Sequence, residues 1–331
     1  MHEREYILNK SKTNENKKII AVCNIFDNVE TEIDRINYSI LNENDKLKIL
    51  MKSKTIDNKG LDEKFSSLYA YISIMVGYYP ELLSGNKFDV KQLSGKYKTQ
   101  ERYIKNDVCF IEKINTKIFI ESYKNFLKLL KKISFQLDYY SIAISTQMGS
   151  YPQITIVNIL QCLDGIYDCL QVTSKNRFYF NKKKAKEIKE TIKNIDFKNI
   201  VCDEKLGKLE KQLNDATCRI ERYNYNDKLE YLFNDIDCKY NIFKLEKNRT
   251  GENNEFEQFI NKCKKTRNKF SHALNEDDNC FNGVESALYL EKIVLVFRLL
   301  IIDEIKLDKL INIEKLNCLL SNINNWIKDN R

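Results

Sequence analysis

Residues 255–274, EFEQFINKCKKTRNKFSHAL, carry the pattern around which the rest of the chain is arranged. Their apolar residues recur at helical spacing, which predicts a helix with one buried face. These residues are Phe256, Ile260, Cys263, Phe270 and Leu274. Arg267 falls in the gap of this stripe, where a guanidinium needs a carboxylate, a phosphate or water beside it because its desolvation is costly. His272 follows five residues later and is the only histidine besides His2.

Two apolar segments flank this helix along the sequence. Upstream, residues 156–170, IVNILQCLDGIYDCL, include Asp164 among apolar neighbours. Downstream, a polar turn at 275–282 leads into the apolar segment 288–302. From Glu121 onward the spacing of apolar residues is helical almost throughout, which predicts that the C-terminal part consists of packed helices.

The pair Arg267 and His272, with Asn268 directly after the arginine, resembles the Arg-x(4-6)-His signature of HEPN domains. The order of the flanking segments resembles the ApeA-like subgroup, with Asp164 in the place of its usual acidic residue. This resemblance covers roughly the C-terminal half of the chain. It implies a HEPN-like helical bundle and a ribonuclease whose catalytic residues are Arg267, Asn268 and His272, with the motif at a two-fold interface.

Composition sets bounds on the fold. A chain of 331 residues can bury a sizeable core and form two domains, and only 2 prolines and 9 glycines favour helices over a turn-rich β fold. We therefore expect a mainly α protein. A smaller mixed α/β domain is expected at residues 1–120 and a HEPN-like helical domain at 121–331. We find no catalytic cluster in the first domain, and within the ribonuclease hypothesis we expect it to have a sensing or regulatory role.

Elements of the N-terminal domain are predicted from local patterns. Residues 1–18 are polar and are expected to be frayed. Strands are expected at 19–26 and 36–41, joined by a loop at 27–34, and a strand pair at 108–120. A helix is expected at 61–79, stopped before Pro80, and a loop-rich connection at 84–106.

The remaining C-terminal segments are also predicted as helices. Residues 126–140 carry one apolar stripe, and Pro152 is expected in the first turn of the next helix. Further helices are expected at 181–195, 203–222, 228–235 and 313–327, and a turn at 249–254.

The charge of the chain suits a polyanionic partner. Its net charge is +8 and its pI about 8.8, although lysine and asparagine enrichment also arises in AT-rich genomes. Lysines gather in two places that we predict to contact RNA, namely Lys182, Lys183 and Lys184, and Lys264, Lys265 and Lys269. A solvated helix face is the alternative explanation for both sets.

Cysteine usage and hydropathy predict no metal, no cofactor and no membrane span. The 10 cysteines include no Cys-x-x-Cys pair, and several, such as Cys162, Cys169, Cys263 and Cys318, lie in apolar helical patterns that suit buried thiols in a reducing cytosol. The longest apolar runs, at 68–79 and 293–302, are too short to span a bilayer, and Arg298 interrupts the second. We expect a cytoplasmic protein.

The residues of the motif suit metal-independent RNA cleavage. RNA supplies its own nucleophile, the 2′-hydroxyl, so a nuclease needs a proton-transfer group and a cation for the phosphate. Histidine suits the first task and arginine the second, while Asn268 can bind a phosphate oxygen or orient the histidine. The nearby helix C-terminus would favour the protonated form of His272 and thus a general-acid role.

One geometric problem follows from the spacing. Five residues along an ideal helix turn the side-chain direction by about 140°, so Arg267 and His272 would point different ways. Either the helix distorts or ends within the motif, or two copies of the motif meet in a dimer. A dimer is expected to form through the face bearing Phe256, Ile260, Cys263 and Phe270.

Two functions are therefore open. The first is an RNA endonuclease that acts as a toxin or antiphage effector, with an activating ligand or partner of unknown identity. The second is a non-catalytic adaptor, in which a degenerate HEPN domain serves dimerisation or RNA binding. The intact residues Arg267, Asn268 and His272 favour the first.

Overall fold

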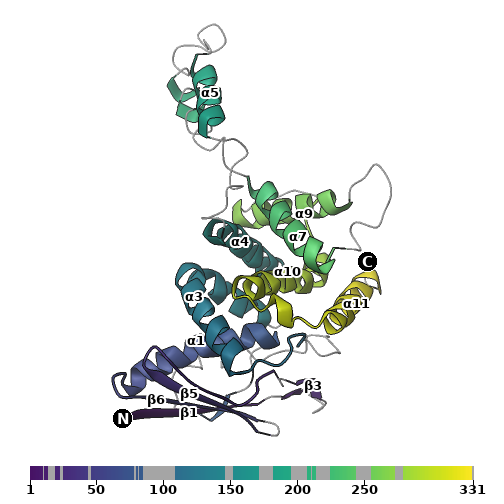
Figure 1. The fold of residues 1–331 in the computed structure, drawn as a ribbon. Coiled ribbons are helices and arrows are strands. Elements are labelled where there is room, and N and C mark those ends of the chain that lie inside the picture. The colour runs from purple at the N-terminus through teal and green to yellow at the C-terminus, as the bar shows by residue number, and fades with distance from the viewer. Residues whose placement is uncertain are drawn as a thin grey trace.

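The protein is mainly helical, with an antiparallel five-stranded sheet formed by its N-terminal part (Figure 1). The computed structural model describes residues 1–9, 11–13, 19–22, 25–43, 46–77, 80, 82–84, 109–145, 152–170, 182–194, 207–209, 211–213, 224–243, 255–272 and 279–329. The expected fold class, mainly α with a small α/β part, is therefore confirmed in outline.

Strands occupy the beginning of the chain. They are β1 (His2–Asn9), β2 (Ser11–Thr13), β3 (Ile19–Val22), β4 (Val29–Ile33), β5 (Ile36–Glu43), β6 (Lys46–Ser53) and β7 (Leu82–Ser84). The main sheet has the order β4-β5-β6-β1-β7, and β2 and β3 pair separately. In β6, Leu47, Ile49 and Met51 are buried, whereas Lys48 and Lys52 lie on the other face. This alternation fixes which face of the sheet meets the core.

Helices form the rest of the described chain. They are α1 (Asn58–Val76), α3 (Thr116–Ser145), α4 (Pro152–Leu170), α5 (Lys182–Lys193), α7 (Tyr225–Tyr240), α9 (Glu255–His272), α10 (Gly283–Glu304) and α11 (Ile313–Asp329), with a short 3₁₀ turn η2 (Asp308–Leu310). In Figure 1, α1 and α3 lie between the sheet and the other helices, α7 and α9 lie beyond them, and α5 lies farthest from the sheet.

Helix α1 is fastened to the sheet by aromatic and charged contacts. The ring of Tyr6 on β1 stacks on Phe65 at 3.6 Å between centroids, and its hydroxyl donates a hydrogen bond to Asp62. Arg4 also contacts Asp62, with 3.2 Å between Nε and Oδ1. The helix begins at the cap Asp57, whose side chain accepts from the Gly60 amide, and ends at Gly77 with φ of 81°.

Helix α10 runs through the centre of the helical part and is buried at almost every position from Leu288 to Ile302. It contacts α1, α3, α4, α7 and α11. Arg298, only 3% exposed, lies within this apolar helix. Its Nε donates to the Ile74 carbonyl at 2.5 Å, its Nη2 donates to the Met75 carbonyl, and its Cζ lies 4.2 Å from the Phe110 ring centroid. Arg298 on α10 thus caps the C-terminal end of α1.

Several predictions for the N-terminal part are wrong. Residues 1–18 are not frayed throughout, because β1 is an inner strand between β6 and β7. The expected loop at 27–34 contains β4, and β6 was not expected at all. Instead of a strand pair at 108–120, the chain forms two isolated bridges, at Ile111 and Ile114, and then enters α3. Polar residues on the solvent face of these strands concealed them, and the apolar residues of 116–120 belong to a helix.

The predicted helices fare better. Helices at 61–79, 126–140, 181–195, 228–235, 288–302 and 313–327 are confirmed with shifted ends, and Pro152 opens α4 as expected. The connection predicted at 84–106 begins at the last residue of β7, and its remainder, the turn at 249–254 and most of 203–222 lie outside the described residues. The boundary expected at residue 120 falls inside α3, and the division into two domains stays a prediction.

No helix in the described part of the chain combines the length and apolar character needed to cross a membrane. Among the cysteines expected to be buried, Cys162 and Cys263 are buried, Cys169 is half-buried, and Cys318 is exposed, so the prediction for Cys318 is wrong. Among the described residues, no group of three His, Cys, Asp or Glu side chains is placed to hold a metal ion.

Replacing Arg298 should test the junction between α1 and α10. The variant Arg298→Met keeps an unbranched side chain and leaves the Ile74 and Met75 carbonyls without their donor. We expect the free energy of unfolding to fall by about 3 kcal/mol or more, measured by urea titration. Lys128→Met on the exposed side of α3 is the control and should change it by less than about 0.5 kcal/mol. Equal stability of Arg298→Met and wild type would contradict this account.

Candidate functional site

Most of the apolar stripe of α9 is buried against other helices of the same chain. Phe256, Phe259, Ile260 and Cys263 are buried, and the helix contacts α4 and α7. Its sequence favours this helix because these residues recur every three or four positions. The residues that follow on the same helix include Arg267, Asn268 and His272.

This burial corrects the expected dimer face. Phe256, Ile260 and Cys263 are 5%, 3% and 0% exposed in the single chain, so they are not available to a second copy. Phe270 alone of the four residues is accessible, at 42%. The homodimer itself stays a prediction, and its interface does not consist of the proposed stripe.

The end of α9 is tied to the beginning of α10. The hydroxyl of Thr266, which is fully buried, accepts a hydrogen bond of 2.8 Å from the Phe281 amide. One turn earlier, Lys262 Nζ lies 2.6 Å from Glu285 Oε1. Glu285 also completes a capping box with Asn282, the N-cap residue of α10. The segment that carries Arg267 is therefore held against the start of α10 at residue 266 and one turn before it.

Arg267 is half-buried and is held by two neighbours. Its Nη1 donates to Asn268 Oδ1 at 3.2 Å, and its Cζ lies 5.1 Å from the centroid of the Tyr225 ring. Its Nε is buried and meets no acceptor among the described residues. Within that part of the chain Arg267 also forms no ion pair with a carboxylate. The sequence suggested a carboxylate, a phosphate or water as the partner of Arg267, and the described residues supply no carboxylate.

The helix remains continuous through the motif. It runs as an α-helix from Glu255 to His272, so it neither distorts nor ends before the histidine. Positions 267 and 272 therefore differ by about 140° around its axis, whereas positions 268 and 272 share one face. The side chain of His272 lies outside the part that the structure describes. Of the two alternatives, the meeting of two motif copies in a dimer remains open.

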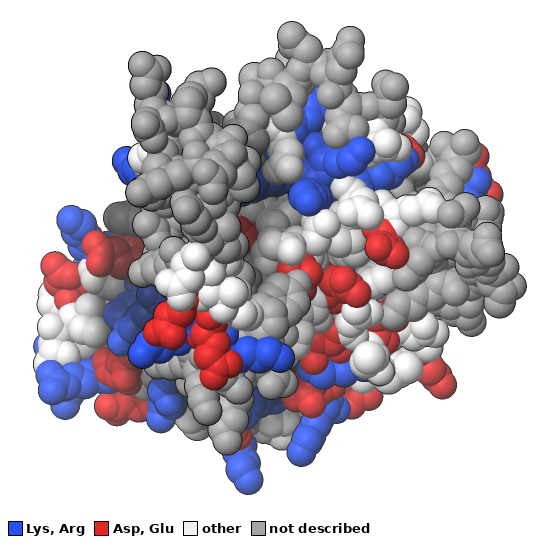
Figure 2. Space-filling model, turned by 90° about the horizontal axis from the view of Figure 1, so that it is seen from above, with Lys and Arg blue, Asp and Glu red and all other residues white. Residues whose placement is uncertain are grey.

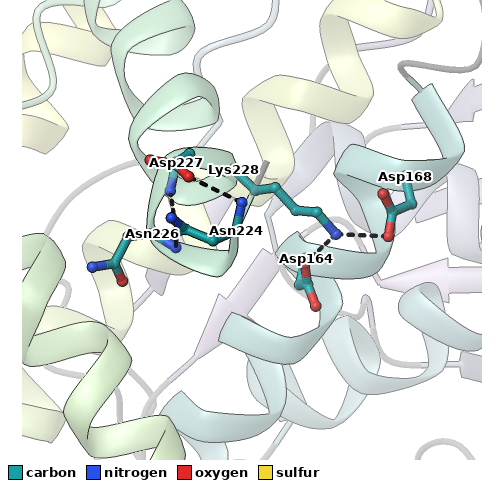
Figure 3. Close-up of polar contacts among 6 residues, drawn as sticks. All are labelled: Asp164, Asp168, Asn224, Asn226, Asp227 and Lys228. Carbon is teal, nitrogen blue, oxygen red and sulfur yellow. Dashed lines mark hydrogen bonds and ion pairs between the residues drawn. The ribbon is translucent and has the colours of Figure 1, made fainter. Parts of the chain in front are cut away.

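The face of α7 towards α4 carries a lysine between two carboxylates (Figure 3). Lys228 Nζ lies 2.8 Å from Asp164 Oδ1 and 2.8 Å from Asp168 Oδ2, both on α4. Burial disfavours the ammonium, but the hydrogen bonds to the two aspartates outweigh this, so the pKa of Lys228 is raised. Asp164 is therefore a partner of Lys228 rather than of Arg267.

Tyr225 is the first residue of α7 and lies between α4 and α9. Asn224 caps this helix, since its side chain accepts from the Asn226 and Asp227 amides, and Asp227 accepts from the Asn224 amide. Burial raises the pKa of Tyr225 well above its usual value; the neighbouring Cys263 adds to this, Arg267 opposes it and Asp164 adds further. The phenol thus stays neutral, and its ring offers an uncharged face to the guanidinium.

The two sets of lysines lie in different places. Lys264 is exposed and Lys265 and Lys269 are half-buried, all on α9 with Arg267. Lys182, Lys183 and Lys184 begin α5, which Figure 1 places away from α9; Lys184 is exposed, and the side chains of the other two lie outside the described part. Figure 2, seen from above Figure 1 with α5 nearest the viewer, shows Lys and Arg side chains gathered in the upper middle of the face and acidic side chains below them. The structure thus brings only the α9 lysines near the motif.

Sequence reasoning missed Tyr225, Lys228 and Gln161. Gln161 on α4 donates to Ser271 Oγ at 2.9 Å and so holds the last turn of α9. The predicted helix began at Lys228, although Asn224 followed three residues later by an acidic residue is the signal of a capping box and would have moved its start to Tyr225. The contacts of Lys228 and Gln161 to other helices had no local signal.

Comparisons with protein-family models, with curated proteins and with solved structures found no match to this chain.

The link between α9 and α10 can be tested at Thr266. Thr266→Val keeps the shape of the side chain and leaves the buried Phe281 amide without its acceptor. We expect a loss of about 1–3 kcal/mol in the free energy of unfolding, measured by urea titration. Thr191→Val is the control, because the Thr191 hydroxyl is exposed and bonds only to Glu187 of its own helix among the contacts described. A Thr266→Val protein as stable as the control variant would show that this hydrogen bond does not hold the two helices.

Proposed function

We propose that this chain is a metal-independent RNA endonuclease of the HEPN type, in which α4, α7, α9 and α10 belong to a HEPN-like bundle. The observation that carries the proposal is the state of Arg267. Its guanidinium is half-exposed, is held by Tyr225 and Asn268, and has no carboxylate partner among the described residues. A structural arginine usually has a carboxylate or, like Arg298, backbone carbonyls as acceptors, and an arginine whose Nε meets neither suits a phosphate.

In the proposed reaction the substrate supplies the nucleophile. The 2′-oxygen attacks the adjacent phosphorus in line as its proton leaves, the bond to the 5′-oxygen breaks, and the 5′-oxygen takes up a proton. A 2′,3′-cyclic phosphate and a 5′-hydroxyl result. His272 moves protons, with the helix C-terminus favouring the charged form that donates to the leaving oxygen, and Arg267 stabilises charge on the phosphate. Asn268 orients these groups.

The wider biological role follows from the same proposal. An RNA endonuclease of this kind would act in the cytoplasm as a toxin or antiphage effector, and the N-terminal part would sense a trigger or restrain activity. Arg298 offers a physical link for such control, because it joins α10 to the end of α1. A homodimer would bring the histidine of one copy towards the arginine of the other.

The second candidate is a non-catalytic helical adaptor that dimerises or binds RNA. The angle of about 140° between positions 267 and 272 favours it, because no single copy places both residues on one face of α9. Cleavage experiments on motif variants separate the two candidates.

The central test is RNA cleavage by motif variants. We expect the wild-type protein to cut single-stranded or loop RNA in EDTA, to leave DNA of the same sequence intact and to be toxic to a host cell. His272→Ala and Arg267→Ala should each lower the single-turnover rate by about 100-fold or more with RNA binding largely kept, and Asn268→Ala should lower it less. His2→Ala is the matched control, since His2 is exposed on β1. Cleavage by His272→Ala as fast as by His2→Ala would favour the adaptor, and cleavage that needs a divalent ion would sink the metal-free mechanism.

The lysines at the start of α5 are expected to contribute to binding rather than chemistry. Changing Lys182, Lys183 and Lys184 together to alanine should weaken RNA affinity and reduce the slope of log K against log salt by about 2, with the cleavage rate of bound RNA unchanged. The control is the exposed α3 triplet Lys124, Lys128 and Lys131 changed in the same way. Filter binding across salt concentrations measures the RNA affinity and its salt slope. Equal slopes for the two triple variants would show that α5 is only a solvated helix.

A further inference from the structure

The first turn of α7 lies between the helix that carries the acidic residues and the helix that carries Arg267. Tyr225 and Lys228 are three residues apart and so lie on one face of α7. Lys228 reaches α4 at Asp164 and Asp168, and Tyr225 meets the guanidinium on α9. These two side chains connect α4 with Arg267 through α7.

Lys228 holds the first turn of α7 in place. Its side chain is only 15% exposed, and its ammonium contacts two carboxylates that lie one turn apart on α4. It also lies over the ring of Tyr167, 5.7 Å from its centroid. The capping box at Asn224 fixes where the helix starts. With both ends of this turn fixed, Tyr225 has little freedom to move away from Arg267.

The ring of Tyr225 in turn restricts Arg267. A free arginine samples many rotamers, and stacking on an aromatic face selects those in which the guanidinium plane covers the ring. The hydrogen bond that Arg267 Nη1 donates to Asn268 Oδ1 further restricts the rotamers of the arginine. The ring carries no charge that would neutralise the guanidinium, so its positive charge stays available to an anion.

We propose that Tyr225 and Lys228 are positioning residues for Arg267, a role that rests on the proposed ribonuclease function. Tyr225 holds the guanidinium where it meets the phosphate, and Lys228 holds Tyr225 by fixing α7 to α4. Neither residue touches RNA in this account. Their loss lowers the rate of the chemical step through misplacement of Arg267 and leaves RNA affinity close to that of the wild type.

Helix α7 offers matched controls for both residues. Near its other end, Lys239 also lies between two aspartates, 3.2 Å from Asp235 and 2.6 Å from Asp303. Tyr231, on the same helix, packs edge-on against Tyr167 at 5.6 Å between centroids. Neither Lys239 nor Tyr231 is described in contact with Arg267. A purely structural role for α7 predicts similar effects at the first turn and at the two control positions, whereas positioning predicts effects on the chemical step at the first turn alone.

The experiment compares Tyr225→Leu, Tyr225→Phe and Lys228→Met with Tyr231→Leu and Lys239→Met in the full chain. In single-turnover cleavage we expect Tyr225→Leu and Lys228→Met to be about tenfold slower with RNA affinity changed by less than about twofold. Tyr225→Phe keeps the ring and should retain the rate, and the two control variants should also do so. Equal rates for Tyr225→Leu and Tyr231→Leu overturn the proposal.

A second measurement does not depend on activity. In spectra of isotope-labelled arginine side chains, the Arg267 Nε–H resonance, identified by its loss in Arg267→Lys, should be shifted by the ring current of Tyr225. Tyr225→Leu should abolish this shift, Lys228→Met should reduce it, and Tyr225→Phe and Lys239→Met should keep it. An Arg267 resonance that is indifferent to Tyr225→Leu overturns the positioning role even if RNA is cleaved. If the Arg267 resonance shifts as expected but His272→Ala cleaves RNA as fast as the wild type, the proposed function is overturned. The contact between Tyr225 and Arg267 is then a packing contact.

Discussion

The buried guanidinium of Arg298 is the polar contact that fixes the end of α1 to α10. The last carbonyls of a helix have no partner within it and carry the negative end of its dipole, so a cation placed there is favourable. Arg298 fulfils this role for α1 through the carbonyls of Ile74 and Met75. Gly77 is part of the same arrangement, because its φ is 81° and a Cβ added there would lie 2.5 Å from Arg298 Nη1. An arginine within an apolar run, which looked like an interruption in the sequence, thus joins α10 to α1, beside the packing of α3 on α1 and β4.

Because Arg298 lies on α10, the same helix connects this junction with the candidate site. The beginning of α10 is fastened to α9 through Phe281 and Glu285, which contact Thr266 and Lys262. Arg267 is adjacent to Thr266, so its backbone position is fixed from the α10 side, while Gln161 and Tyr225 fix it from α4 and α7. The position of the guanidinium is therefore set by three helices that are far apart in the sequence.

The sequence predicted those elements whose identity depends on local periodicity. Helices such as α9 and α10 carry apolar residues at every turn, and they lie where expected. Strand β1 was missed because HEREYILN offers only Tyr6 and Leu8 to the core, and the partner of Glu5, Lys48, is distant in the sequence. The site shows the same limit. Arg267, Asn268 and His272 share a helix as predicted, but the stack of Arg267 on Tyr225 and the contact of Lys228 with α4 arise only from packing. The burial of Phe256, Ile260 and Cys263 was expected at a dimer interface, and it occurs within one chain because α4 and α7 pack on that stripe of α9.

The continuous helix assigns a particular importance to Asn268. Residues 267 and 271 share the face of α9 that meets α4 and α7, as the contacts of Arg267 with Tyr225 and of Ser271 with Gln161 show. Residues 268 and 272 share the neighbouring face, one helical turn apart. Asn268 accepts a hydrogen bond from Arg267 on the first face and itself belongs to the second. In the proposed mechanism the guanidinium of Arg267 and the imidazole of His272 therefore lie on different faces of one helix. Asn268 contacts Arg267 and lies on the same face as His272. Arg267 and His272 of one chain can therefore act on the same phosphate only if that phosphate lies at the C-terminal end of α9, within reach of both side chains. Otherwise a second copy must supply one of the two residues.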